Sequence, residues 1–168
     1  MQLTFDELEA CRDFTARVQA DKRAHGVVDR KFDKNNTSEG VNLMGIAGEI
    51  LAARFFGWDP DCALHPFGDG GRDAIHRGLA FQVKTSTTSR LIFNSADKFS
   101  TDIAVAVQMF GDRNEVTLDT RFSILGLISR KRFFEVCQTM NFGYGDRLVC
   151  SYKDLGGLEV IEQFGVVL

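Results

Sequence analysis

The sequence predicts an α/β or α+β layer fold in which helices flank a mixed β-sheet. Apolar residues recur at helical spacing over residues 4–24 and again over 41–56. Residues 72–86 have the pattern of two short strands, while the continuous apolar runs 103–107 and 122–128 are typical of strands covered on both faces. Helices therefore flank a series of strands, some of which are doubly buried.

Two helices are expected in the first third of the chain. The first covers residues 4–24, with Thr4 as a candidate N-cap. Residues 25–40 are polar and have the composition of a loop. The second helix is expected from about Val41 to Phe56 and should end at Gly57, because glycine suits the left-handed position after a last helical turn.

The rest of the chain is expected to form short elements. Ser129 has the position of a cap for a short helix that extends to about Gln138. Arg77-Gly78 would join two strands in a hairpin. Strands are expected at 61–67, 72–76, 79–86, 91–93, 103–107 and 122–128, with one or two more from Asp146 onward.

Length and composition are those of an ordinary single domain. A chain of 168 residues suits one compact unit, here a helical segment 1–40 packed on a core 41–168. The 15 Phe residues predict an interior rich in phenyl rings. No run approaches the roughly 18 apolar residues of a membrane span, and the N-terminus lacks the pattern of a signal peptide. We therefore expect an intracellular, cytoplasmic protein without a membrane partner.

Cysteine and histidine spacing gives little support for a zinc or redox site. The cysteines form no C-x-x-C pair, so reduced and mostly buried thiols are expected. The histidines show no H-x-x-x-H spacing. These residues are Cys11, Cys62, Cys137 and Cys150, and His25, His65 and His76.

Glu49 is a candidate acidic ligand on the second predicted helix. About one turn to either side of it stand Gly45, Ala52 and Ala53, small residues that let a helix approach a sheet closely. Such neighbours favour a carboxylate that does not lie on a solvated face. The alternative is an exposed glutamate, which is the commoner case for this residue type.

A second acid, Asp73, lies at the start of the predicted hairpin. Glycines at positions 70 and 71 directly precede this part of the chain and indicate a turn at which the backbone comes close to another group. An aspartate at the start of a strand is usually turn chemistry when it stands alone. Its relation to the next strand makes Asp73 a candidate site residue.

Strand pairing brings Asp73 together with two further polar residues. A two-residue hairpin loop pairs Ile75 with Ala80, so that Asp73 falls opposite Gln82. Side chains alternate along a strand, and Gln82 and Lys84 therefore share one face. A four-residue loop gives the same pairing, whereas a three-residue loop would send Asp73 to the opposite face.

These residue types fit a divalent-metal site. Mg²⁺ prefers hard oxygen ligands, typically one or two carboxylates completed by waters and a substrate phosphate. Asp73 and Glu49 would supply carboxylate oxygens, and Gln82 a neutral amide oxygen. Lys84 beside the metal would orient or deprotonate an attacking water, or stabilise charge that develops on a phosphate. The alternative for Lys84 is a solvated lysine on an edge strand.

The ordered set Gly45-x-x-Gly48-Glu49, then Asp73, then Gln82-Val83-Lys84-Thr85-Ser86 resembles the PD-(D/E)XK nuclease superfamily in its Q-x-K variant. The resemblance covers about residues 41–130 and implies a restriction endonuclease-like core, a mixed sheet flanked by helices. It also implies that Asp73, Gln82 and the Val83 carbonyl bind Mg²⁺, for which Mn²⁺ can substitute. Glu49 would complete the site from the helix, and Lys84 would assist the nucleophilic water.

The sequence departs from the superfamily pattern at two positions. Arg72 stands where a proline commonly precedes the aspartate, and Gln82 replaces the second acid. The neutral side chain removes one negative charge from the metal pocket. Weaker metal binding is therefore expected unless Glu49 compensates.

Candidate phosphate contacts surround the site. Three cations stand in the first turn of the helix after Ser129, where they oppose the helix macrodipole. An anion bound there would resolve the conflict, and a solvated basic cluster is the alternative. The net charge of −3 runs against nucleic-acid binding unless positive charge is local to the binding face. The candidates are Arg72, Arg77, Thr85, Ser86, Arg130, Lys131 and Arg132.

Three functions are compatible with these patterns. The first is a Mg²⁺-dependent endodeoxyribonuclease of relaxed or structure-selective specificity, with DNA as its partner. The second is a catalytically weak or inactive nuclease-like domain that binds nucleic acid or a protein. The third is a structural or regulatory protein whose polar strand face is incidental. A homodimer would suit cleavage of both strands of a duplex, but no residue pattern indicates one.

Overall fold

The computed structural model describes residues 1–27, 37–59, 71–143 and 145–157. The helices are α1 (Phe5–Ala24), α2 (Ser38–Phe56) and α3 (Arg130–Val136), with 3₁₀ turns at Ala96–Lys98 and Tyr152–Asp154. The strands are β1 (Ala74–His76), β2 (Leu79–Ser86), β3 (Arg90–Phe93), β4 (Ile103–Phe110), β5 (Arg121–Ser129), β6 (Gln138–Asn141) and β7 (Asp146–Ser151). The predicted strand 61–67, together with Cys62 and His65, lies outside the described residues.

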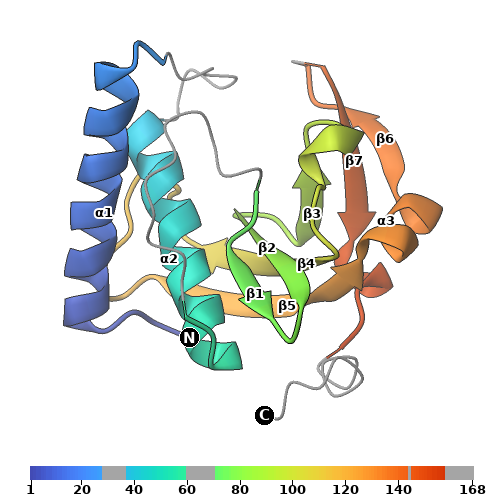
Figure 1. Cartoon of the computed structure of the whole chain (residues 1–168), viewed down its shortest axis with the longest axis horizontal. Helices are drawn as coiled ribbons and strands as arrows, with labels where there is room; N and C mark the ends of the chain where they lie inside the picture. The colour runs from blue at the N-terminus through green and yellow to red at the C-terminus, as the bar shows by residue number, and fades with distance from the viewer. Residues whose placement is uncertain (28–36, 60–70, 144, 158–168) are drawn as a thin grey trace.

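The strands form two sheets (Figure 1). The larger sheet has the order β1-β2-β4-β5 and is mixed, because β2 and β4 run parallel while the other neighbours are antiparallel. The smaller sheet has the order β3-β7-β6 and is antiparallel. An α/β fold around a mixed sheet is thus confirmed. The sequence did not predict the division into two sheets.

Local capping explains the helix starts. Thr4 caps α1 in a capping box with Glu7, as the sequence predicted for Thr4. Helix α2 starts at Ser38, three residues before the expected Val41, because the Thr37 hydroxyl accepts a hydrogen bond from the backbone of Gly40 at 3.0 Å. Gly57 ends α2 with φ +68°, the predicted left-handed cap.

The smaller elements match the sequence less closely. Ser129 caps α3 as expected, but the helix ends at Val136 and Gln138 already belongs to β6. Strand β6 was not predicted, since its side chains are polar or mostly exposed, and it pairs with β7 through the backbone and a hydrogen bond from the Asn141 side chain to Asp146 at 2.8 Å. Strand-like alternation is absent from such a segment.

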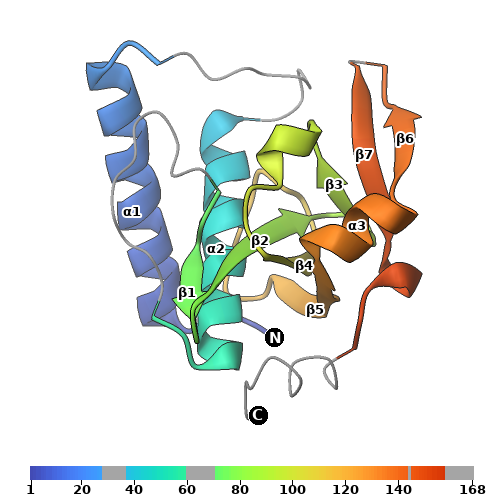
Figure 2. The ribbon, with the colours of Figure 1, turned by 45° about the vertical axis from the view of Figure 1, so that its right-hand side comes forward.

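The large sheet separates two apolar layers (Figure 2). Helices α1 and α2 lie on one side of it, and α3 with the smaller sheet lies on the other. Strand β4 contributes to both layers because its side chains alternate. The first buried cluster includes Leu51, Ala52, Phe81, Val83, Ile103, Val105, Val107 and Met109. The second consists of Leu91, Phe93, Phe99, Ala104, Ala106, Ile128, Phe133 and Cys150.

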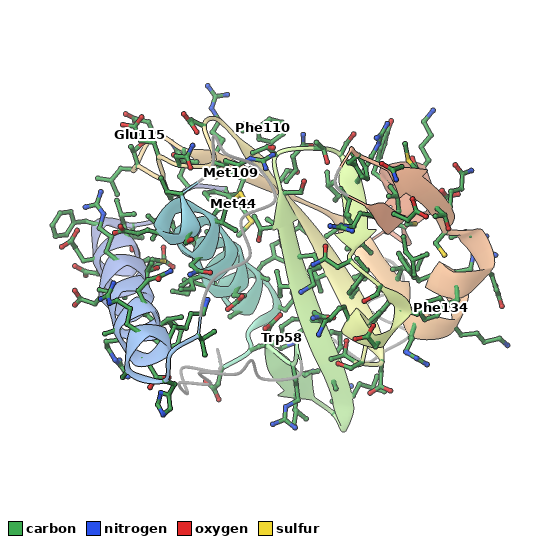
Figure 3. The ribbon with its side chains drawn as sticks, turned by 90° about the horizontal axis from the view of Figure 1, so that it is seen from above. Met44, Trp58, Met109, Phe110, Glu115 and Phe134 are labelled. Carbon is green, nitrogen blue, oxygen red and sulfur yellow. The ribbon has the colours of Figure 1, made fainter. Side chains whose placement is uncertain are left out.

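Helix α2 spans the length of β2 in the antiparallel direction. Figure 3 labels Met44 near its start and Trp58 just beyond its end, and both belong to the first cluster. The Trp58 ring packs against Phe81 near the beginning of β2, with the ring centroids 4.4 Å apart and the ring planes tilted by 44°. Among the described residues, none of the helices combines the length and the apolar character that a membrane span requires.

Gly48 sets how closely α2 approaches β2. A Cβ atom built on Gly48 would overlap the Thr85 hydroxyl and lie 3.0 Å from the Thr85 Cβ atom. Gly45, one turn earlier, faces open space, with nothing within 4 Å of a built Cβ. The two glycines of the Gly45-x-x-Gly48 pair therefore have different roles, and only Gly48 is required by packing.

We predict opposite effects of alanine at these two positions. Gly48→Ala should lower the free energy of unfolding by about 1–3 kcal/mol, because it overpacks a tight interface. Gly45→Ala should raise it by roughly 0.5–1 kcal/mol, because alanine is the better helix former and meets no neighbour. Urea denaturation of both variants measures the difference, and equal effects would contradict the assigned packing.

Candidate functional site

The β1–β2 hairpin has the geometry that the sequence predicted. Arg77 and Gly78 form the two-residue loop with φ +50° and +80°, as in a type I′ turn. Ile75 pairs with Ala80, as predicted, and the register continues to Ala74 opposite Phe81. Asp73 lies directly beyond the last paired residue, so its pairing with Gln82 stays a prediction.

Asp73 lies at the edge of β2, where β1 begins. Its backbone N–H donates to the Phe81 carbonyl at 2.9 Å. One of its carboxylate oxygens, Oδ2, accepts a hydrogen bond from the Val83 N–H at 2.6 Å. The carboxylate thus takes the place of a strand carbonyl beside β2.

The Val83 peptide group faces the same edge. The N–H and C=O groups of one residue in a strand point toward the same neighbouring strand. Since the Val83 N–H points at Asp73, the Val83 carbonyl is directed to that side as well. A carboxylate and a peptide oxygen, both hard ligands for a divalent cation, are therefore grouped beside β2.

Gln82 is buried deeply, with 2% of its surface exposed. Its amide lies against the backbone of Gly71, where a Cβ atom would overlap Nε2. Gly71 has φ +81°, so glycine is required there on both counts. The close approach that the glycine pair indicated in the sequence is thus a contact with the Gln82 side chain.

The Gln82 amide oxygen is buried and has no hydrogen-bond partner within the described part of the chain. Buried polar atoms normally have a partner, because a missing hydrogen bond costs about 1–3 kcal/mol. A cation would satisfy this oxygen as a ligand. The donor set around Asp73 therefore fits a metal ion chemically.

Lys84 lies on the same strand face as Gln82, opposite α2. Its Nζ atom is 5.7 Å from the centroid of the Phe93 ring on β3. The residue is half-buried, in contrast to the alternative of a solvated lysine on an edge strand. The aromatic contact restrains the ammonium group beside Gln82.

Glu49 lies on α2, across the sheet from Gln82 and Lys84. It is half-buried and follows Gly48, which contacts Thr85 on β2. Its charge contributes to the environment of Cys11, where burial first, and then Glu7 and Glu49, raise the pKa of the thiol to about 12. The structure thus places Glu49 on the helix that covers β2, while Gln82 and Lys84 lie beneath the same strand.

Few acidic ligands are available to a metal here. Across residues 1–27, 37–59, 71–143 and 145–157, no three His, Cys, Asp or Glu side chains gather closely enough to hold an ion. A site at this edge would therefore combine at most two carboxylates with amide and peptide oxygens. Such a set suits Mg²⁺, which keeps several waters when it binds to proteins.

The predicted phosphate contacts have different surroundings. Arg72 and Arg77 are exposed beside the hairpin. Thr85 faces α2, and its buried hydroxyl is without a partner among the described residues. The Ser86 hydroxyl forms a hydrogen bond with Thr88 at 3.0 Å.

The cations of α3 are partly engaged within the protein. The Arg130 guanidinium donates to the Phe99 carbonyl at 2.7 Å, and its backbone N–H donates to the Asp102 carbonyl. Arg132 forms an exposed ion pair with Glu135 at 3.2 Å, and Lys131 is exposed. The hydrogen bonds of Arg130 favour a structural role for that residue over the proposed anion site.

Searches against protein-family models, curated proteins and solved structures give no match for this chain. Its function is therefore inferred from the residues and their arrangement alone.

The buried Cys11 thiol predicts a loss of stability at high pH. The unfolded thiol ionises above its ordinary pKa of 9.0, whereas in the folded protein its pKa is about 12. The free energy of unfolding should therefore fall as the pH rises from 9 toward 12, by up to about 1.4 kcal/mol per pH unit. Urea denaturation at pH 8 and pH 10.5 measures this loss. In Cys11→Ala the loss should be about 2 kcal/mol smaller, and an identical loss in both proteins would contradict the prediction.

Proposed function

We propose that the protein is a Mg²⁺-dependent nuclease that hydrolyses phosphodiester bonds of DNA, with a restriction endonuclease-like core formed by α2 and the β1-β2-β4-β5 sheet. One observation carries the proposal. At one sheet edge, the Asp73 carboxylate bonds the Val83 N–H, and Gln82, the residue before Val83, has a buried amide oxygen without a hydrogen-bond partner among the described residues. Lys84 is held on the same strand.

The residues divide into metal ligands and a proton-handling group. Asp73, Gln82 and the Val83 carbonyl would hold Mg²⁺ or Mn²⁺, and Glu49 would add charge from α2. The bound metal would polarise the phosphate and lower the pKa of a water molecule. Lys84 would orient that water, accept its proton or stabilise the charge that develops on the phosphate.

One observation favours a second candidate function, a nuclease-like domain that binds nucleic acid without cleaving it. Gln82 is neutral, so the metal pocket holds one charge fewer than it would with an acid there. One carboxylate oxygen of Asp73 already accepts a hydrogen bond from the Val83 N–H. Cleavage assays separate the two functions directly.

Cleavage should require Asp73 and Lys84. Asp73→Asn and Lys84→Met should each reduce the rate by a factor of about 10²–10⁴, because they remove a metal ligand and the proton-handling group. Supercoiled, linear, single-stranded and four-way-junction DNA are incubated with Mg²⁺, with Mn²⁺ or with a chelator.

Exposed residues of the same types provide matched controls. Asp119→Asn and Lys153→Met should leave the rate unchanged, since both side chains are exposed outside the candidate site. Thermal denaturation confirms that each variant is folded. Full activity in both site variants, or no cleavage of any DNA form by the unmodified protein, would overturn the proposal.

Restoring the acid should strengthen metal binding. Gln82→Glu should lower the Kd for Mg²⁺ about tenfold, since the added charge attracts the cation. Without metal, the buried carboxylate should lower the Tm, and Mg²⁺ should recover it.

Calorimetry and thermal denaturation, each with and without Mg²⁺, measure the two effects. Gln138→Glu on the exposed side of β6 is the control and should show neither. A Gln82→Glu variant with unaltered metal affinity would show that Gln82 is not a ligand.

A further inference from the structure

A hydroxyl-rich segment follows Lys84 at the end of β2. Residues 85–89 are five consecutive Ser or Thr residues, and Arg90 follows them. The Ser86 hydroxyl accepts from the Thr88 backbone at 3.1 Å and bonds the Thr88 hydroxyl at 3.0 Å, which fixes the turn. Hydroxyl groups of this kind commonly contact phosphate oxygens in nucleic-acid complexes.

Arg113 comes to the same place from a distant part of the sequence. Its Nη2 atom donates to the Thr87 hydroxyl at 2.9 Å. Because β2 and β4 are parallel, both strands finish at the same end of the sheet. Arg113 lies in the loop that follows β4 at this end. Phe110 and Glu115, labelled in Figure 3, flank that loop on the side where α2 begins.

The backbone of Arg113 is fixed against α2. A Cβ atom on Gly40 would lie 3.0 Å from the Arg113 carbonyl oxygen and 2.6 Å from the Asn114 Cα atom. Asn114 in turn accepts a hydrogen bond from the Thr37 N–H at 2.8 Å. The arginine is thus presented from a loop that is packed against the start of a helix.

The guanidinium group has no acidic partner within the described ranges. Asp112, Glu115 and Glu39 stand nearby in the sequence or on the facing helix, yet none forms an ion pair of 4 Å or less with Arg113. A half-buried guanidinium with one neutral hydrogen bond retains most of its five donors. The planar guanidinium group can donate two parallel hydrogen bonds to one phosphate, which is therefore a well-matched ligand for it.

We infer that Arg113, together with the Thr87 hydroxyl, binds a phosphate of the nucleic-acid backbone away from the scissile one. This inference rests on the proposed function, which supplies nucleic acid as the ligand of Arg113. Thr87 is the fourth residue after Val83, about 13 Å along a strand. Since each DNA strand carries a phosphate about every 3.4 Å of helix axis, a short duplex is long enough to reach both sites.

A purely structural role for Arg113 makes different predictions. If Arg113 only ties the β2–β3 turn to the β4–β5 loop, Arg113→Gln and Thr87→Val should lower the Tm equally and leave DNA binding at every salt concentration unchanged. If Arg113 contacts a phosphate, that contact releases one counterion from the DNA on binding. A variant without the arginine releases one counterion fewer, so the affinity depends less steeply on salt.

Fluorescence anisotropy of a 30-base-pair duplex with the full chain tests the inference, in a chelator and over a range of NaCl concentrations. Arg113→Gln should weaken binding about tenfold and reduce the slope of log K against log salt by about 0.9. Arg113→Lys should keep the slope, since the charge remains. Arg121→Gln, an exposed arginine on β5, is the matched control and should leave affinity and slope unchanged.

The outcomes distinguish this inference from the proposed function. An Arg113-dependent slope without cleavage under any metal supports the inference and overturns the nuclease activity. Cleavage by the unmodified protein with an unaltered slope and KM in Arg113→Gln overturns the inference alone. Absence of DNA binding by the unmodified protein at low salt overturns the phosphate assignment.

Discussion

The close contact between α2 and β2 at Gly48 determines the position of most other elements. Phe81 and Val83 are buried in the same apolar cluster as Leu51 and Ala52 of the helix. Helix α1 packs on α2, where Arg54 pairs with Glu7, and Met1 adds a backbone link to Phe122. Gly48 therefore sets how closely the helix that carries Glu49 lies against the strand that carries Gln82 and Lys84.

The sequence predicted best those parts of the fold in which the interacting residues are close together in the chain. The Arg77-Gly78 loop was sufficient to predict the register of the hairpin. The alternation of side chains along β2 was sufficient to predict the sheet face on which Lys84 lies. Both features depend only on residues that are adjacent in the chain. The start of α2 was wrong, since Thr37 is held by Asn114, 77 residues away. The pairing of β3 with β7 was missed for the same reason, since their paired residues are 55 to 61 positions apart, from Phe93↔Leu148 (148 − 93) to Arg90↔Ser151 (151 − 90).

The candidate site shows the same division. The alternation of strand side chains predicted Asp73 opposite Gln82, but no pattern indicated that the Asp73 carboxylate would bond the Val83 N–H. Nor did it indicate that Gln82 would be almost fully buried. This burial gives a physical reason for the amide: an uncompensated carboxylate at such a position is far more costly than a neutral group. The amide at position 82 is therefore less costly to the stability of the protein than a buried carboxylate would be.

Strand β4 links the two apolar clusters through a single backbone. Val105 faces the first cluster while Ala104 and Ala106 face the second, and β4 pairs with β2 on one side and with β5 on the other. Neither cluster can be exposed without disrupting the strand that belongs to both. The two layers should consequently unfold as one cooperative unit, and the amide hydrogens at the centre of β4 should exchange with solvent only through global opening of the molecule.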